Sequence, residues 1–141
     1  LPRSATHLLV SSGGNDALWD AFLLDAAVPD IRTAFDLVGE RVERFAEEYR
    51  MFLRDLAETD LPRAVCTIYD RVPGIGRAER TALSIYNDVI TKAARDFGAS
   101  VIDFRNILTE AADYSASSTI EPSSTGGRKL AAATAEWLLR S

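Results

Sequence analysis

The stretch THLLVSSGGNDALWD, residues 6–20, decides the fold. Its apolar run from His7 to Val10 ends in two serines and two glycines, and a segment compatible with a helix follows. This pattern is typical of a buried strand in a parallel sheet, which delivers the next loop to the carboxyl edge of that sheet. Open α/β sheets bind their ligands at this edge. We therefore expect the loop around Asn15 to belong to a ligand site.

Two more apolar runs, at 64–69 and 100–104, are rich in β-branched or aromatic residues and predict two further strands. Helices are predicted between the strands, because apolar residues recur there at spacings of three and four. Gly98 is placed to cap the second helix, and a last helix is expected over 127–140. The expected buried residues are Val38, Val42, Phe45, Tyr49, Phe52 and Leu56 in the first helix, Ala82, Ile85, Tyr86, Val89, Ile90, Ala93 and Phe97 in the second, and Leu130, Trp137 and Leu138 in the last.

Alternating strands and helices of these lengths predict a layered α/β fold with a parallel sheet and right-handed crossovers. The loops at 11–16, 70–76 and 105–125 then all leave the same edge of the sheet, and we expect the functional site there. Because the sequence opens almost directly with a strand, we expect further strands of the sheet to precede Leu1.

The composition is that of one ordinary globular domain, since 47% of the 141 residues are hydrophobic and 26% are charged. The net charge is −5, and acidic and basic residues interleave along the middle of the chain, so we expect no nucleic-acid partner. No apolar run approaches the ~18 residues that cross a bilayer, and no signal peptide is recognisable, so we expect a cytoplasmic protein without a membrane partner. Cys66, the only cysteine, lies within an apolar run and is expected in the core.

The only histidine, His7, is predicted at the amino end of the first strand. Ser11 is roughly 13 Å further along the strand, which is too far for His7 to act as a base there. Neither a complete Ser-His-Asp triad nor a His-rich metal site can therefore be assembled from this chain. Gly74 and Gly76 have the spacing of a dinucleotide-binding loop but lack its third glycine, so a turn into a helix is the preferred interpretation over a nucleotide site.

The loop SSGGND supports two interpretations that do not exclude each other. In a structural one, the glycines allow a tight turn, and Asn15 or Asp16 caps the helix that follows. In a functional one, the side-chain amide of Asn15 and the N–H groups of the glycines are preorganised donors for an oxyanion.

Three segments, HLLVSSGGNDAL, AVCTIYDRVPG and DYSASSTIEPSSTGGRKLA, resemble in this order the SGNH hydrolases, also called GDSL-type esterases and lipases. The resemblance covers nearly all of the chain and is closer to a bacterial branch whose last block reads IEPS followed by a Gly-Gly pair. Its most specific element is GGND, in which Gly14 and Asn15 match the glycine and the oxyanion-hole asparagine of the family's third block. The resemblance implies a single three-layer α/β/α domain with a parallel central sheet, of which residues 1–141 form the C-terminal part. It also implies hydrolysis of a small-molecule acyl ester, without a metal or an organic cofactor, by a serine upstream of Leu1.

The sequence departs from the family pattern at the catalytic base. Ser118 and Glu121 stand where the family has the Asp and the His of Asp-x-x-His, and the Gly-Asp-Ser block is absent. A glutamate side chain ordinarily has a pKa of about 4.3, which suits a base for a serine hydroxyl poorly, so a slow esterase is expected. The alternative is a non-catalytic module that binds a small ligand or a partner protein. The expected site residues are Gly14, Asn15 and Glu121 for catalysis and Asp16, Asp113 and Ser118 for substrate binding.

Overall fold

The three apolar runs form one parallel sheet in the computed structural model, which describes residue 2 and residues 4–141. Within these residues the strands are β1 (Leu8–Val10), β2 (Arg63–Cys66) and β3 (Ser100–Ile102), paired in the order β1-β2-β3. Their register places Val10 opposite Val65 and Val65 opposite Val101. The predicted α/β class with a parallel sheet is confirmed.

Four α-helices flank the strands in the described part of the chain: α1 (Gly14–Trp19), α2 (Ile31–Ala57), α3 (Arg77–Asp96) and α4 (Ser124–Leu138). Short 3₁₀ turns lie in the connections, at Asp20–Asp25, Phe104–Asn106 and Ala111–Asp113. Just beyond the end of α3, Gly98 has a φ of 66°, as its predicted capping role requires. None of the described helices has the length and apolar composition needed to cross a membrane.

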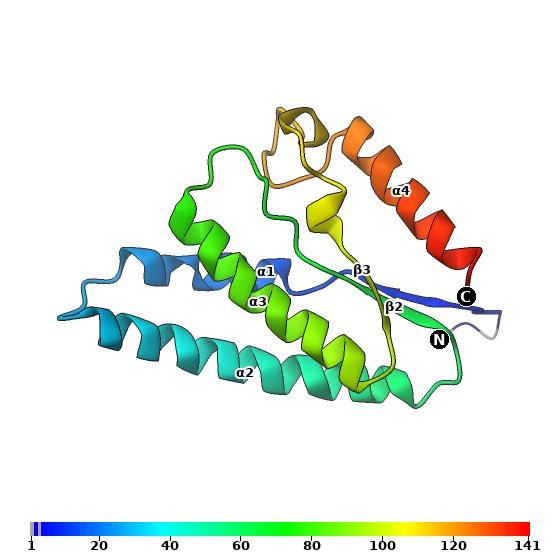
Figure 1. Cartoon of the computed structure of the whole chain (residues 1–141), viewed down its shortest axis with the longest axis horizontal. Helices are drawn as coiled ribbons and strands as arrows, with labels where there is room; N and C mark the ends of the chain where they lie inside the picture. Colours follow the sequence, from blue (N-terminus) through cyan, green and yellow to red (C-terminus); the bar gives the residue numbers. More distant parts are fainter. Residues whose placement is uncertain (1, 3) are drawn as a thin grey trace.

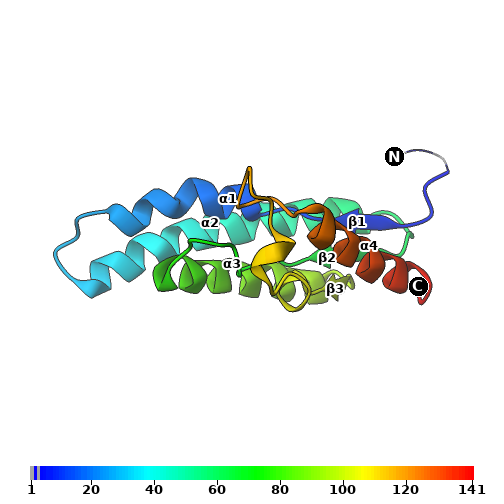
Figure 2. The same cartoon turned by 90° about the horizontal axis from the view of Figure 1, so that it is seen from above.

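The helices cover both faces of the sheet and so make three layers (Figure 1). On one face α2 and α3 lie side by side along their lengths, as Figure 2 also shows. On the other face α4 packs Leu130 and Trp137 against Ala64, Cys66 and Ile102. The core between the sheet and the helices α2 and α3 consists of Val10, Phe45, Tyr49, Leu53, Val65, Tyr86, Ile90, Ala93 and Ala94.

Two of the predicted buried residues are exposed. Phe52 is 41% exposed, and the adjacent Leu53 is buried in its place, because the inward face of α2 follows the spacing of four from Phe45 through Tyr49. Leu138, expected to anchor the last helix, is also 41% exposed, since it lies at the final residue of α4.

The last helix begins at Ser124, earlier than the predicted start at 127. The reason is Ser123, whose Oγ accepts hydrogen bonds from the N–H groups of Thr125 at 3.1 Å and Gly126 at 3.2 Å. A serine in the N-cap position satisfies two donors that the first turn would otherwise leave without a partner.

Candidate functional site

A cavity of about 460 Å³ lies at the carboxyl edge of the sheet, against α1, the first turns of α3 and the loop after β2. Each of the three predicted loops contributes to its wall, through Gly14, Ile75 and Ile120. The topology accounts for this, because the carboxyl ends of parallel strands lie at one edge of the sheet. The polar side chains in the wall include Asn15, Asp16, Asp20, Arg41, Thr67 and Tyr86.

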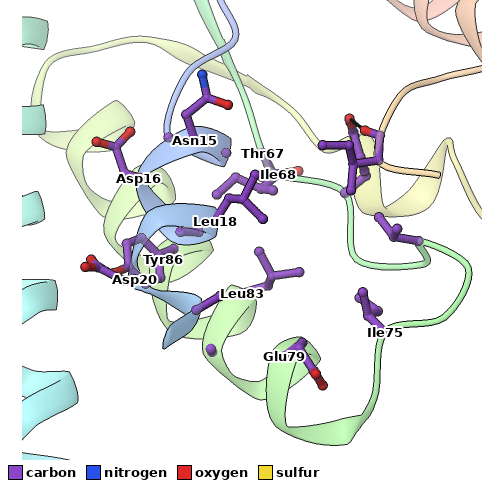
Figure 3. A pocket seen from close by; sticks show the side chains of 18 of the residues that line it. Asn15, Asp16, Leu18, Asp20, Thr67, Ile68, Ile75, Glu79, Leu83 and Tyr86 are labelled. Atoms are coloured by element: carbon purple, nitrogen blue, oxygen red, sulfur yellow. Dashed lines mark hydrogen bonds between the residues drawn. The ribbon is translucent and has the colours of Figure 1, made fainter. Parts of the chain in front are cut away.

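The loop after β1 turns into α1 at Gly13. Its φ of 100° lies in the left-handed region, and a Cβ there would stand 3.0 Å from the ring of Phe45 and 3.2 Å from the side chain of Ile90. Glycine is therefore required by the backbone conformation and by the close packing against α2 and α3. Gly13 itself holds the N-cap position of α1, so neither Asn15 nor Asp16 caps this helix. Both side chains are exposed in the wall of the cavity (Figure 3).

A buried asparagine on α3 fixes the part of the wall that Ile68 forms. The side-chain amide of Asn87 accepts a 2.7 Å hydrogen bond from the N–H of Ile68 and donates one of 2.8 Å to its carbonyl. The amide thereby supplies both partners that a neighbouring strand would supply, beyond the point where β2 ends. The sequence analysis missed Asn87, although a polar residue beside the apolar stripe of α3 is a visible signal.

Asp103 ties the ends of β2 and β3 together. The hydroxyl of Thr67 donates a 2.8 Å hydrogen bond to it, and the guanidinium of Arg105 donates to both carboxylate oxygens at 2.7 and 2.6 Å. The guanidinium of Arg105 and then the hydroxyl of Thr67 hold the pKa of Asp103 below its ordinary value, although burial acts in the opposite direction. Asp103 is therefore negatively charged at neutral pH, and its hydrogen bonds hold the ends of β2 and β3 together. The sequence offers a signal for it, since Asp103 is an acidic residue within the apolar run at 100–104.

Asp20 and Arg41, on the α1 side of the cavity, are paired with each other. The hydroxyl of Tyr86 donates a 2.5 Å hydrogen bond to Asp20, and the other carboxylate oxygen lies 3.8 Å from Nε of Arg41. Burial, and then this hydrogen bond to the carboxylate, raises the pKa of Tyr86. The guanidinium of Arg41 also lies over the ring of Phe22, 5.7 Å from its centre. This cation is therefore engaged by Asp20 and Phe22.

The loop that precedes α4 is closed at a narrow neck. Tyr114 and Pro122 form an isolated antiparallel bridge, and the N–H of Ser115 donates a 2.8 Å hydrogen bond to the carbonyl of Glu121. Inside the neck, the N–H of Glu121 donates to the carbonyl of Ser118 at 2.9 Å. The neck thus holds residues 115–121 as one compact turn.

Tyr69 connects this turn to the cavity. Its hydroxyl donates to the carbonyl of Ile120, and both residues line the cavity. Burial raises the pKa of Tyr69, and the negative charge of Glu121 raises it further. Glu121 and Ser118 belong to this turn without forming part of the cavity wall.

Asp113, predicted from the sequence to bind substrate, does not line the cavity and instead contacts other parts of the chain. The side chain is buried, with a carboxylate oxygen 2.7 Å from Nζ of Lys129 and the carboxylate accepting a 3.0 Å hydrogen bond from the N–H of Glu110. Lys129 holds the pKa of Asp113 below its ordinary value, against the opposing effect of burial, and the N–H of Glu110 adds to the lowering. The carbonyl of Asp113 accepts a 2.8 Å hydrogen bond from the N–H of Ser123. These contacts anchor the neck to α4.

The structure gives no site at the other residues considered in the sequence, which are His7 and the glycines Gly74 and Gly76. His7 precedes β1, and its ring stands edge-on to that of Trp137, 5.5 Å between centres. Gly74 and Gly76 form a turn into α3, where the carboxylate of Glu79 already accepts a 2.9 Å hydrogen bond from the N–H of Gly76. Within the residues that the structure describes, His, Cys, Asp and Glu side chains form no group of three that could hold a metal ion.

The fold is similar to that of two enzymes of known structure. No protein-family model matches the sequence, and no curated protein matches it. LAE5, "an alpha/beta hydrolase enzyme from the metagenome of Lake Arreo, Spain", is 18% identical with a TM-score of 0.68, over 92% of this chain and 57% of its own. The acetyl xylan esterase AlAXEase is 15% identical with a TM-score of 0.66, over 93% of this chain and 66% of its own. These likenesses show the fold, and the chain spans less than two thirds of either enzyme.

Proposed function

We propose that the whole protein is an SGNH-type esterase, in which this chain supplies the oxyanion donors and a segment before Leu1 supplies the serine. The observation that carries the proposal is the position of Gly14 and Asn15. Both lie at the carboxyl edge of the sheet, in the wall of a cavity, on a turn whose shape Gly13 fixes. Two proteins with the same fold are by description hydrolytic enzymes, one of them an acetyl xylan esterase.

The free edge of β1 leaves room for the strand that would carry the nucleophile. Among the described residues β1 pairs with β2 alone, so its other edge carries no strand. A parallel strand added at this edge would lie about 4.8 Å from β1. A serine at its carboxyl end would therefore reach the space in front of Gly14 and Asn15.

In this mechanism the serine hydroxyl attacks the carbonyl carbon of the ester, and its proton passes to the alcohol that leaves. The amide of Asn15 and the N–H of Gly14 donate to the carbonyl oxygen while it carries negative charge, which lowers the barrier. Water then releases the acid from the acyl-serine. Glu121 stands where a histidine base is expected, and we propose that it orients water or substrate in a slow enzyme.

The test is Asn15→Ala in the whole protein, assayed with a simple aryl ester. Removing one oxyanion donor should lower kcat by a factor of about 10²–10³ and leave the unfolding midpoint nearly unchanged. The matched control is Asn106→Ala, which removes an exposed amide outside the cavity wall and should keep parental turnover. Parental turnover in Asn15→Ala would show that this amide does not stabilise the oxyanion.

A second candidate function is a non-catalytic binding module on the same fold. The absence of histidine from the described cavity favours it, because the serine would lack its usual base. For either function we propose a small molecule as the ligand of a cytoplasmic protein. A whole protein that binds an ester analogue at the cavity and hydrolyses no ester would support the second.

A further inference from the structure

The cavity has a polar end and an apolar end. Figure 3 shows Asn15 and Thr67 at one end, next to the ends of the strands, and Leu83 and Ile75 at the other, with Glu79 beside them. Leu18 of α1 lies between the two ends. Beyond the polar end the wall is mainly aliphatic and includes Leu18, Ile68, Val72, Ile75, Ala82 and Leu83.

The charged side chains of the wall are poorly placed to bind an anionic ligand. Arg41 is the only cation among the described residues of the wall, and Asp20 and Phe22 already engage it. Glu79 turns its carboxylate to the N–H of Gly76. A carboxylate or phosphate entering the cavity would meet the negative charges of Asp16, Asp20 and Glu79 without a free positive partner, so an anionic group fits poorly. The aliphatic surface from Leu18 to Leu83 fits an apolar group instead.

We propose that this cavity takes the acyl group of the substrate and that the group is an aliphatic chain much longer than acetyl. The inference rests on the esterase function proposed above. The carbonyl would lie at the polar end, near Asn15, and the chain would extend past Leu18 and Ile68 toward Leu83. Leu83 is in the second turn of α3 and lines the cavity. An acetyl group would leave this aliphatic surface uncovered, whereas the volume of about 460 Å³ is that of a small-molecule site.

The binding step can be tested separately from turnover, in the whole protein. The probes are n-alcohols from butanol to decanol, titrated into ¹⁵N-labelled protein and followed by amide chemical shifts. Each methylene that enters the cavity contributes about 0.8 kcal/mol, so affinity should rise about fourfold per carbon until the cavity is full. The shifts should concentrate at Ile68 and Leu83. Affinity independent of chain length, or shifts confined to the exposed Trp19 and Phe22, would overturn the proposal.

A cavity-filling variant provides the second arm. Leu83→Trp should lower the affinity for decanol at least tenfold while butanol binding changes little, because the indole occupies the space of the distal carbons. The matched control is Ser84→Trp, which places the same side chain on the exposed face of α3 and should bind like the parent. If Leu83→Trp does not fold, Ala82→Leu offers a smaller filling group with the same expected direction. Unchanged decanol binding in a folded filling variant would overturn the proposal.

Turnover separates this inference from the proposed function. In the whole protein, p-nitrophenyl octanoate should be hydrolysed with a kcat/KM at least tenfold above that of the acetate, and Leu83→Trp should reverse the preference. An acetate preference in an active parent refutes the long acyl chain while the esterase stands. Chain-length-dependent alcohol binding in a protein that hydrolyses no ester refutes the esterase, and the acyl assignment with it.

Discussion

Two adjacent glycines in α4 should respond to alanine with opposite signs. Gly126 is buried, and a Cβ at this position would overlap the carbonyl oxygen of Asp113 and stand 3.1 Å from Cδ2 of Leu108. At Gly127 a Cβ would meet nothing within 4 Å. The two positions share one helix and one substitution, so they differ only in what surrounds the new methyl group.

The magnitudes follow from three contributions. Alanine is favoured over glycine within a helix by about 0.8–1.0 kcal/mol at either position. At Gly126 the methyl group forces buried backbone apart, which costs about 1–3 kcal/mol. It also strains the hydrogen bond from the N–H of Ser123 to Asp113, a bond contributing about 0.5–1.5 kcal/mol. We therefore expect Gly126→Ala to destabilise by about 1–3 kcal/mol and Gly127→Ala to stabilise by about 0.5–1 kcal/mol.

Urea unfolding of both variants, followed by far-UV circular dichroism, measures the two free energies. Because the displaced backbone leads to residues 115–121, the Gly126→Ala protein should also bind decanol more weakly than the Gly127→Ala protein. Shifts of the same sign in the two unfolding midpoints would refute the packing argument, since helix propensity alone acts equally at both positions.

Three other expectations concern the buried polar contacts and the replaced base. Asn87→Ala leaves the partly buried N–H and C=O of Ile68 without partners and should cost about 1–3 kcal/mol in urea unfolding, whereas Asp88→Ala on the exposed face should stay within about 0.5 kcal/mol. The lowered pKa of Asp113 gives stability above the ordinary carboxyl pKa of about 4 that is lost as pH falls through the lowered value, so Asp113→Asn should flatten the acid dependence of the urea midpoint. In the whole protein, Glu121→His with Ser118→Asp should raise aryl-ester turnover; a fall from a high parental rate would show that another base already acts.

The order of strands and helices could be predicted because it is encoded in local periodicity. The run at 64–69 was nevertheless too long a prediction for β2, which ends at Cys66. Beyond it, Ile68 bonds to Asn87, nineteen residues away, rather than to a strand. An apolar run indicates that a segment is buried. It does not indicate whether the backbone of that segment bonds to a strand or to a side chain. Local pattern therefore locates the segment and misjudges its partner.

The same limit divides the candidate site. The turn at Gly13 and the exposure of Asn15 follow from a strand, a turn and a helix that are contiguous in the sequence. The position of Asp113 depends on Lys129, sixteen residues further along and in another element, and no spacing rule announces that ion pair. Asp103 and Arg105 are close in the sequence, but their role in joining the strand ends depends on Thr67, which directly follows β2.

The neck between Tyr114 and Pro122 gives the loop a modular character. Since the bridge and the anchor at Asp113 fix both ends, residues 115–121 can be exchanged as a cassette while the sheet and α4 keep their contacts. Doubling the length of such a closed loop costs only about 0.6 kcal/mol in chain entropy. Segments inserted at Ser117 would therefore change the surface beside the cavity while the rest of the domain stays folded. This turn is a suitable position for redesigning selectivity.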